Sequence, residues 1–144
     1  MLRAGTLSGM AATGLERDPS DGWLVVPFPT PGAFEAWLDD HHTTEPGLWV
    51  KFAKKGTGMP SLTLPEAIEV AACFGWVDSK MHGVDETWYV LRFQPRRARS
   101  SWSPGNRELA ERLIADGRMR PAGLAQVAAA RAGGRWEASR ATGA

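Results

Sequence analysis

The sequence predicts an α+β fold, in which helices pack on a small, mainly antiparallel sheet in the order β-α-β-α-β-β-α-α. Short apolar or alternating stretches bounded by proline and glycine predict the strands. Between them, a Ser or Thr with a Pro one or two positions later opens segments whose apolar residues recur at helical spacing. Because the chain has 144 residues, we expect a single domain over residues 23–136, between a flexible leader (1–22) and a flexible tail (137–144).

The first half of the chain contains two strand patterns, each followed by a helix pattern. The stretch "WLVVPF" (23–28) predicts the first strand, and Thr30 is the expected N-cap of the helix that follows it. The stretch "GLWVKF" (47–52) alternates, which predicts a strand with one face in the core. The second helix is expected to begin with a capping box formed by Thr63 and Glu66.

The second half predicts a hairpin and then two helices. The stretches "WVDSKMH" (76–82) and "ETWYVLRFQP" (86–95) flank turn residues and predict the two hairpin strands. Ser103, followed by proline, is the expected N-cap of a helix over "NRELAERLIADG" (106–117). The last helix is expected within "RPAGLAQVAAARAGG" (120–134), where two glycines end it.

The hairpin register decides which side chains share a face of the sheet. Alternation places Trp88, Val90 and Arg92 on one face of the second strand. With the turn centred midway between the strands, Trp76 lies opposite Arg92 and Asp78 lies opposite Val90. Trp76, Asp78, Trp88 and Arg92 are then expected on the same side, although a slip of one residue would undo this arrangement.

Charge is distributed unevenly along the chain. Residues 1–91 hold six Lys/Arg and twelve Asp/Glu, a balance of −6, whereas residues 92–144 hold eleven and four, a balance of +7. The overall charge of +1 argues against a general polyanion binder. Such a chain either folds its two halves against each other or presents a basic face to a partner.

Several classes of protein lack support in the sequence. The single cysteine, Cys73, cannot form an internal disulfide and is expected to be a small buried residue. No signal-peptide pattern or membrane-spanning stretch is recognisable, so we expect a cytoplasmic protein with no membrane partner. The histidines His41, His42 and His82 match no zinc spacing, and no nucleotide-binding glycine motif occurs. We therefore expect no metal and no cofactor.

The stretch "RFQPRRARSSWSPGN" (92–106) is the strongest candidate for a binding site. It places Arg96, Arg97, Arg99 and Trp102 just before the expected helix N-terminus at Ser103 to Asn106. Helix N-termini attract anions, arginine suits carboxylate and phosphate, and tryptophan offers a surface for stacking. The alternative is a solvated loop, or arginines paired with the acidic half of the chain.

Asp78 and Arg92 are the candidate catalytic pair. A carboxylate in an apolar strand beside Trp76 is costly to bury unless it is paired or hydrogen-bonded, and Arg92 is an available partner. Asp78 could then act as a general acid or base, with Arg92 stabilising a developing negative charge. The alternative is a structural ion pair that holds the hairpin together.

Five segments between about Phe34 and Trp136 form a recognisable set. They are "AWLDDHH", "GLWVKFAKKG", "EAIEVAACFGWVDS", "DETWYVLRFQPRRARSSWSPGNRELAERLIADGRMRPAG" and "AAARAGGRW". This set resembles the YdeI/OmpD-associated family of bacterial proteins, which are described as protecting against bacteriocins or antimicrobial stress. The resemblance implies an α+β domain but no mechanism. Members of that family often carry a further C-terminal helical segment that the printed sequence lacks, which directs attention to "CFGWVDS" and "RFQPRRARSSWSPGN" as the family's distinctive blocks.

The sequence is compatible with three functions. The first is a protective protein that binds a small flat or anionic molecule, with ring stacking by Trp76, Trp88 and Trp102. Arg92, Arg96 and Arg97 would neutralise the charge of that ligand. The second is a cofactor-independent enzyme that uses Asp78 in the same pocket. The third is a nucleic-acid binder that uses the basic C-terminal third. The sequence leaves the ligand and the oligomeric state open.

Overall fold

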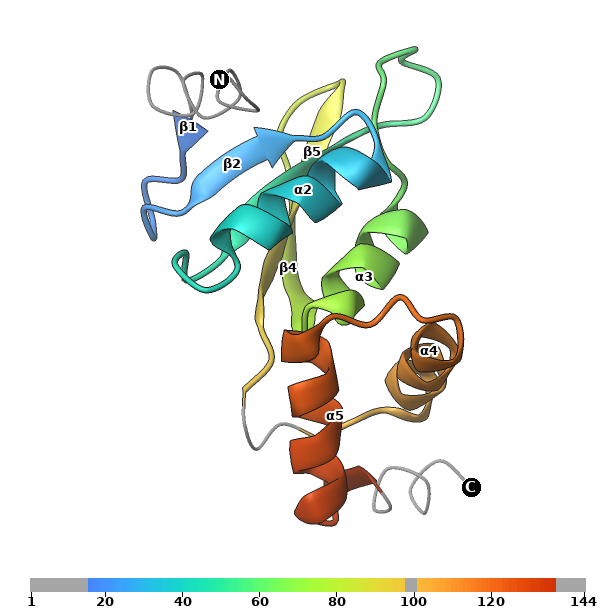
Figure 1. Cartoon of the computed structure of the whole chain (residues 1–144). Helices are drawn as coiled ribbons and strands as arrows, with labels where there is room; N and C mark the ends of the chain where they lie inside the picture. Colours follow the sequence, from blue (N-terminus) through green and yellow to red (C-terminus); the bar gives the residue numbers. More distant parts are fainter. Residues whose placement is uncertain (1–15, 98–100, 137–144) are drawn as a thin grey trace, which may run out of the picture.

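A computed structural model describes residues 16–97 and 101–136 of the chain (Figure 1). Residues 1–15 of the predicted leader and the whole predicted tail (137–144) lie outside the described residues, as does the candidate site residue Arg99. The strands and helices are β1 (Glu16–Arg17), β2 (Leu24–Pro27), α2 (Pro31–His41), β3 (Leu48–Ala53), α3 (Leu64–Cys73), β4 (Trp76–Gly83), β5 (Trp88–Pro95), α4 (Pro104–Ala115) and α5 (Pro121–Ala132).

The strands form one five-stranded sheet in the order β1-β2-β3-β5-β4. The β2–β3 pair is parallel and the other three pairs are antiparallel, so the mainly antiparallel α+β fold is confirmed. The predicted order of elements is also confirmed from β2 onward. The structure adds the short strand β1, which pairs with β2 and lies within the segment expected to be a flexible leader.

Helices cover one face of this sheet. In Figure 1, α2 and α3 lie across the sheet, while α4 and α5 lie next to the end of α3 that leads into β4. The connection from α3 to β4 is tight because Gly75 adopts a positive φ of 77°, a conformation that favours glycine.

The predicted helix starts are confirmed by their capping hydrogen bonds. The Thr30 hydroxyl accepts a bond from the Ala33 N–H at 3.2 Å. The Thr63 hydroxyl accepts from the Glu66 N–H at 3.3 Å, and the Glu66 carboxylate accepts from the Thr63 N–H at 2.8 Å, completing the capping box. These bonds satisfy helix N–H groups that have no partner within the helix.

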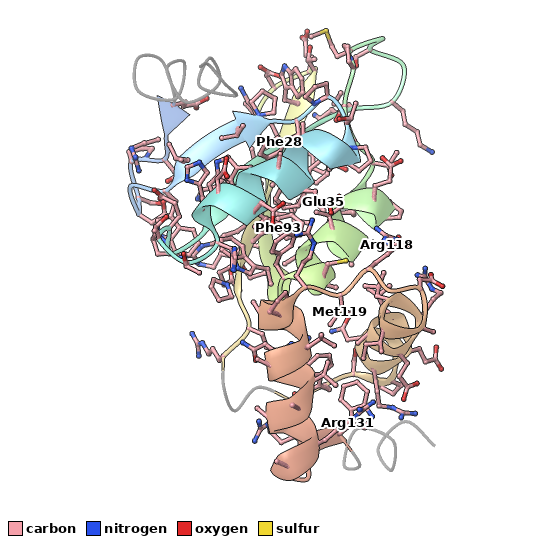
Figure 2. The ribbon with its side chains drawn as sticks, in the orientation of Figure 1. Phe28, Glu35, Phe93, Arg118, Met119 and Arg131 are labelled. Atoms are coloured by element: carbon pink, nitrogen blue, oxygen red, sulfur yellow. The ribbon has the colours of Figure 1, made fainter. Side chains whose placement is uncertain are left out.

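The main core lies between the sheet and the helices. Phe34 of α2 is fully buried and packs against Phe28 and against Phe93 of β5, with ring centroids 5.1 and 5.6 Å away. Figure 2 labels Phe28 and Phe93 in this interior. Leu91 of β5 belongs to the same cluster and Tyr89 packs against it, whereas Val90 lies in a separate cluster on the other face of the sheet. The alternation predicted for this strand is therefore confirmed.

A smaller core lies between α4 and α5. It contains Trp102 and Trp136, whose ring centroids are 5.0 Å apart, together with three small or branched residues of the two helices. Those residues are Ala110, Val127 and Ala130. The two cores meet along α3 and α4, which is where the candidate site lies. Over the described residues, no helix has the length and apolar character needed to cross a membrane.

Candidate functional site

A narrow pocket, here called the central pocket, lies between α3, β4 and α4. Five of the residues selected from the sequence line it: Trp76, Asp78, Arg96, Trp102 and Asn106. The space open to the centre of a water molecule is about 20 Å³, enough for one or two water molecules. The two sequence blocks identified as distinctive therefore meet at one place in the fold.

The walls of the central pocket are mostly apolar and come from helices that the sequence assigned only to packing. Ile68, Ala71 and Ala72 of α3 form one side, and Leu109 and Ala110 of α4 form the other. Sequence reasoning missed these wall residues because an apolar helix face gives the same periodicity whether it lines a pocket or fills a core.

Arg96 is the buried cation of the central pocket. Its residue is 8% exposed, and its guanidinium carbon lies 3.8 Å from the centroid of the Trp102 ring. Its Nη1 donates to the Ser101 carbonyl at 3.0 Å, and its main-chain N–H donates to the Gly75 carbonyl at 2.9 Å. Burial lowers the pKa of Arg96 from its ordinary value, but arginine stays protonated in proteins. The central pocket is therefore lined by a fixed positive charge.

The predicted hairpin register is wrong. Trp76 lies opposite Pro95, and Asp78 lies opposite Phe93, with a shift in pairing between Asp78 and Met81. This shift is a β-bulge, in which two residues of β4 face one residue of β5. Trp76 consequently joins the main core, where it is 2% exposed and packs edge-on against Trp37 of α2. Asp78 is exposed and lines the central pocket.

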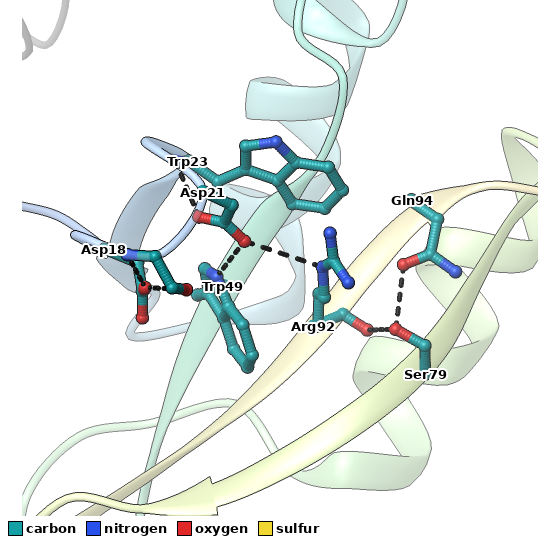
Figure 3. Close-up of polar contacts among 8 residues, drawn as sticks. Asp18, Asp21, Trp23, Trp49, Ser79, Arg92 and Gln94 are labelled. Carbon is teal, nitrogen blue, oxygen red and sulfur yellow. Dashed lines mark hydrogen bonds and ion pairs between the residues drawn. The ribbon is translucent and has the colours of Figure 1, made fainter.

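The predicted Asp78–Arg92 pair is also wrong. Arg92 projects from the opposite face of the sheet, where its Nε lies 3.7 Å from Oδ2 of Asp21 (Figure 3). Its guanidinium carbon lies 4.0 Å from the centroid of the Trp23 ring, and the indole N–H of Trp49 donates to the same Asp21 oxygen at 3.0 Å. Arg92 thus stabilises the open face of the sheet and has no place in the central pocket. Sequence reasoning missed Asp21 because it lay in the expected leader.

Three other candidate residues also lie outside the central pocket. Trp88 is on the open face of the sheet, with Lys51 Nζ 5.6 Å from the centroid of its ring. Arg97 is exposed and does not line the pocket. Ser103 caps α4, because its hydroxyl accepts a bond from the Asn106 N–H at 3.1 Å. Its role is therefore to fix the start of the helix that carries Asn106.

Ion pairs join the acidic first half of the chain to the basic second half. Glu69 of α3 accepts hydrogen bonds from Arg112 at 3.0 Å and Arg118 at 2.9 Å. The bond from Arg118, followed by that from Arg112, lowers the pKa of Glu69 below its ordinary value. Arg120 forms ion pairs with Glu35 and Asp39 of α2, at 2.7 and 2.8 Å. Figure 2 labels Glu35 and Arg118. The acidic first half thus packs against basic residues of the second.

The cysteine thiol and the side chains that commonly hold metals are the other reactive groups to consider. The Cys73 thiol is buried, and burial raises its pKa, as befits a packing residue. Among residues 16–97 and 101–136, no group of three or more His, Cys, Asp or Glu side chains is placed to hold a metal ion.

Comparison with known proteins identifies a family but no activity. A family model described as "Domain of unknown function (DUF8412)" matches residues 26–126. This range includes every residue named above in the central pocket. No curated protein and no solved structure matches the chain. Because the match covers more than half of the sequence, the chain belongs to the DUF8412 family.

Proposed function

We propose that this protein binds a small flat or anionic molecule in the central pocket, and that this binding protects the cell from an antimicrobial compound, a toxic metabolite or a related stress. One observation carries the proposal. Residues chosen from two separate sequence blocks, 76–78 and 96–106, line a single pocket. The resemblance to the YdeI/OmpD-associated family supports the protective role, and the single cysteine suits a cytoplasmic setting.

The chemistry of the central pocket suits a ligand with an apolar body and one negative or hydrogen-bond-accepting group. Buried Arg96 attracts such a group more strongly than it would in water, because the surroundings are of low polarity. The rings of Trp76 and Trp102 offer contact to a flat body. Since the space open to the centre of a water molecule is about 20 Å³, a larger ligand requires the walls formed by α3, β4 and α4 to move apart.

Benzoate is a suitable probe, because it is flat, small and carries one carboxylate. We expect the Arg96→Met variant to bind benzoate at least about tenfold more weakly than the wild type, since a charged hydrogen bond contributes about 1.5–3 kcal/mol. The neighbouring Arg97→Met variant, which loses an exposed charge outside the pocket, should bind benzoate as the wild type does. NMR titration gives the dissociation constants from the amide shifts of central-pocket residues such as Asn106, and equal weakening in both variants would contradict the proposal.

Blocking the central pocket gives an independent check. Ala72 lines it and is partly exposed, so an Ala72→Phe side chain should fill the opening and abolish the benzoate-induced shifts of central-pocket amides such as that of Asn106. Ala129→Phe, on an exposed position of α5, is the matched control. The protective role is tested by the survival of a bacterial host that expresses each variant, exposed to a panel of aromatic carboxylate antimicrobials. Survival conferred equally by wild type and Ala72→Phe would refute that role.

A second candidate function is cofactor-independent acid–base catalysis on a small, natural-product-like substrate. It is favoured by the placement of Asp78, whose exposed carboxylate lines the same pocket as buried Arg96. In this alternative Asp78 transfers a proton and Arg96, in place of Arg92, stabilises the developing negative charge. For any compound that the wild type converts, Asp78→Asn should abolish product formation, measured by mass spectrometry, while the affinity for that compound stays within about threefold. Continued turnover by the variant would exclude Asp78 as the catalytic group.

A further inference from the structure

A second concavity, here called the loop hollow, lies between the ends of β3 and β5 and the loop that joins β3 to α3. The space open to the centres of water molecules is about 370 Å³, within the range of about 300–1,000 Å³ that small-molecule sites occupy. The loop is the green segment that projects from the body of the protein between β3 and α3 in Figure 1. Unlike the central pocket, this space accepts a small organic molecule without any movement of helices.

The floor of the loop hollow is aromatic and apolar. Tyr89 of β5 is half-buried and stacks on the buried Phe52 of β3, with their ring centroids 5.3 Å apart and their planes inclined by 20°. Leu62 and Leu64 complete the floor. Met59 lines the hollow from the loop and is 47% exposed, so its flexible apolar side chain is available for contact at the edge of this floor. The surface therefore offers contact to a flat apolar body.

The charge at the rim is positive. Lys54 and Lys55 line the loop hollow, and no Asp or Glu is among the described residues that line it. The Nζ of Lys54 is held in place by the main-chain carbonyl of Asp85 at 2.6 Å, while Lys55 is exposed. An ammonium group beside an apolar floor favours a ligand that carries a negative charge next to its flat body.

The loop that carries these lysines has an unusual backbone. Gly56 and Gly58 adopt φ values of 82° and 74°, which only glycine adopts readily, and a Cβ at either position would meet nothing within 4 Å. The two glycines thus bend the loop so that Lys55 and Met59 both border the hollow, without filling it. The sequence alone predicted only an exposed turn at "KKGTGMPS".

We propose that the loop hollow is a second ligand site, which binds an aromatic anion by apolar contact with Leu64, Tyr89 and Met59 and by attraction to Lys55. The site is independent of the central pocket, because the two share no lining residue. Binding at the loop hollow is therefore expected whether or not the central pocket binds benzoate.

Titration of the full chain with 2-naphthoate tests this site. In NMR spectra of ¹⁵N-labelled protein, the amide signals of Gly56 and Gly58 should shift and saturate. Lys55→Gln should weaken binding about threefold, as expected for an exposed charge, and the neutral analogue 2-naphthamide should bind the wild type about threefold more weakly. Lys80→Gln, which removes an exposed lysine of β4 outside both sites, should leave the affinity for 2-naphthoate unchanged.

Two further titrations test whether the site recognises phosphate alone and whether the central pocket causes the shifts. Inorganic phosphate alone should not produce saturable shifts, and Ala72→Phe, which blocks the central pocket, should leave the shifts of Gly56 and Gly58 as in the wild type. The proposal is overturned if 2-naphthoate shifts only residues of the central pocket or shifts none. It is also overturned if phosphate saturates the same signals, or if Lys55→Gln and Lys80→Gln weaken binding equally.

Discussion

Replacing Gly123 with alanine is expected to lower the free energy of unfolding by about 3 kcal/mol. Gly123 is buried in α5 where that helix crosses the end of α3. A Cβ at this position would collide with the main-chain carbonyl oxygen of Cys73 and would lie 3.0 Å from the carbonyl carbon. This carbonyl cannot move aside, because it ends α3 and accepts a hydrogen bond from the Arg120 N–H at 2.9 Å. The whole of α5 must shift instead.

Urea denaturation followed by circular dichroism measures this effect. Gly105→Ala is the matched control, because a Cβ on Gly105, in the first turn of α4, would meet nothing within 4 Å. The control should be unchanged or up to about 1 kcal/mol more stable, since alanine is a better helix former than glycine. If both variants kept the stability of the wild type, the close approach of α5 to α3 described here would be wrong.

Local sequence signals predicted the elements of the fold well because their physical causes are local. The hydroxyls of Thr30, Thr63 and Ser103 each accept a bond from an N–H three residues later, so the capping residue and its partner are read from the same short stretch. The alternation of β5 is equally local, since successive side chains of a strand point to opposite faces.

The contacts between separate segments could not be predicted, because the residues that determine them lie far apart in the chain. The face of the sheet on which Trp76 and Asp78 lie depends on a bulge between Asp78 and Met81 that no turn residue predicts. The error mattered, because it placed Arg92 with Asp78 when its partner is Asp21, far away in sequence. The same error placed Trp88 in the site.

Five of the predicted residues still line one pocket, and the reason is simple. Trp76 and Asp78 are two residues apart on β4, so they share a face in any register that preserves the strand there. Arg96, Trp102 and Asn106 follow the end of β5, which the hairpin necessarily brings back beside the start of β4. Which side of the sheet they occupy was set by the bulge and by the position of α4, and neither is encoded within one segment.

Trp102 connects the central pocket to the smaller core. It is 8% exposed, packs against the Trp136 ring at 5.0 Å between centroids, and stacks with the Arg96 guanidinium at 3.8 Å. Removing this ring leaves a void bounded by α4 and α5, and it strips the apolar cover from a buried charge. Both consequences fall on the part of the molecule that closes the pocket.

We therefore expect Trp102→Ala to lower the free energy of unfolding by about 3 kcal/mol or more, the usual cost of truncating a buried tryptophan. Leu124→Ala, at a 43% exposed position of α5, should change it by less than about 0.5 kcal/mol. Hydrogen exchange should show the amides of α4 and α5 losing more protection than those of β3 and β5, because the smaller core is separate from the main one. Uniform loss of protection, or a cost equal to that of Leu124→Ala, would show that Trp102 does not hold this core together.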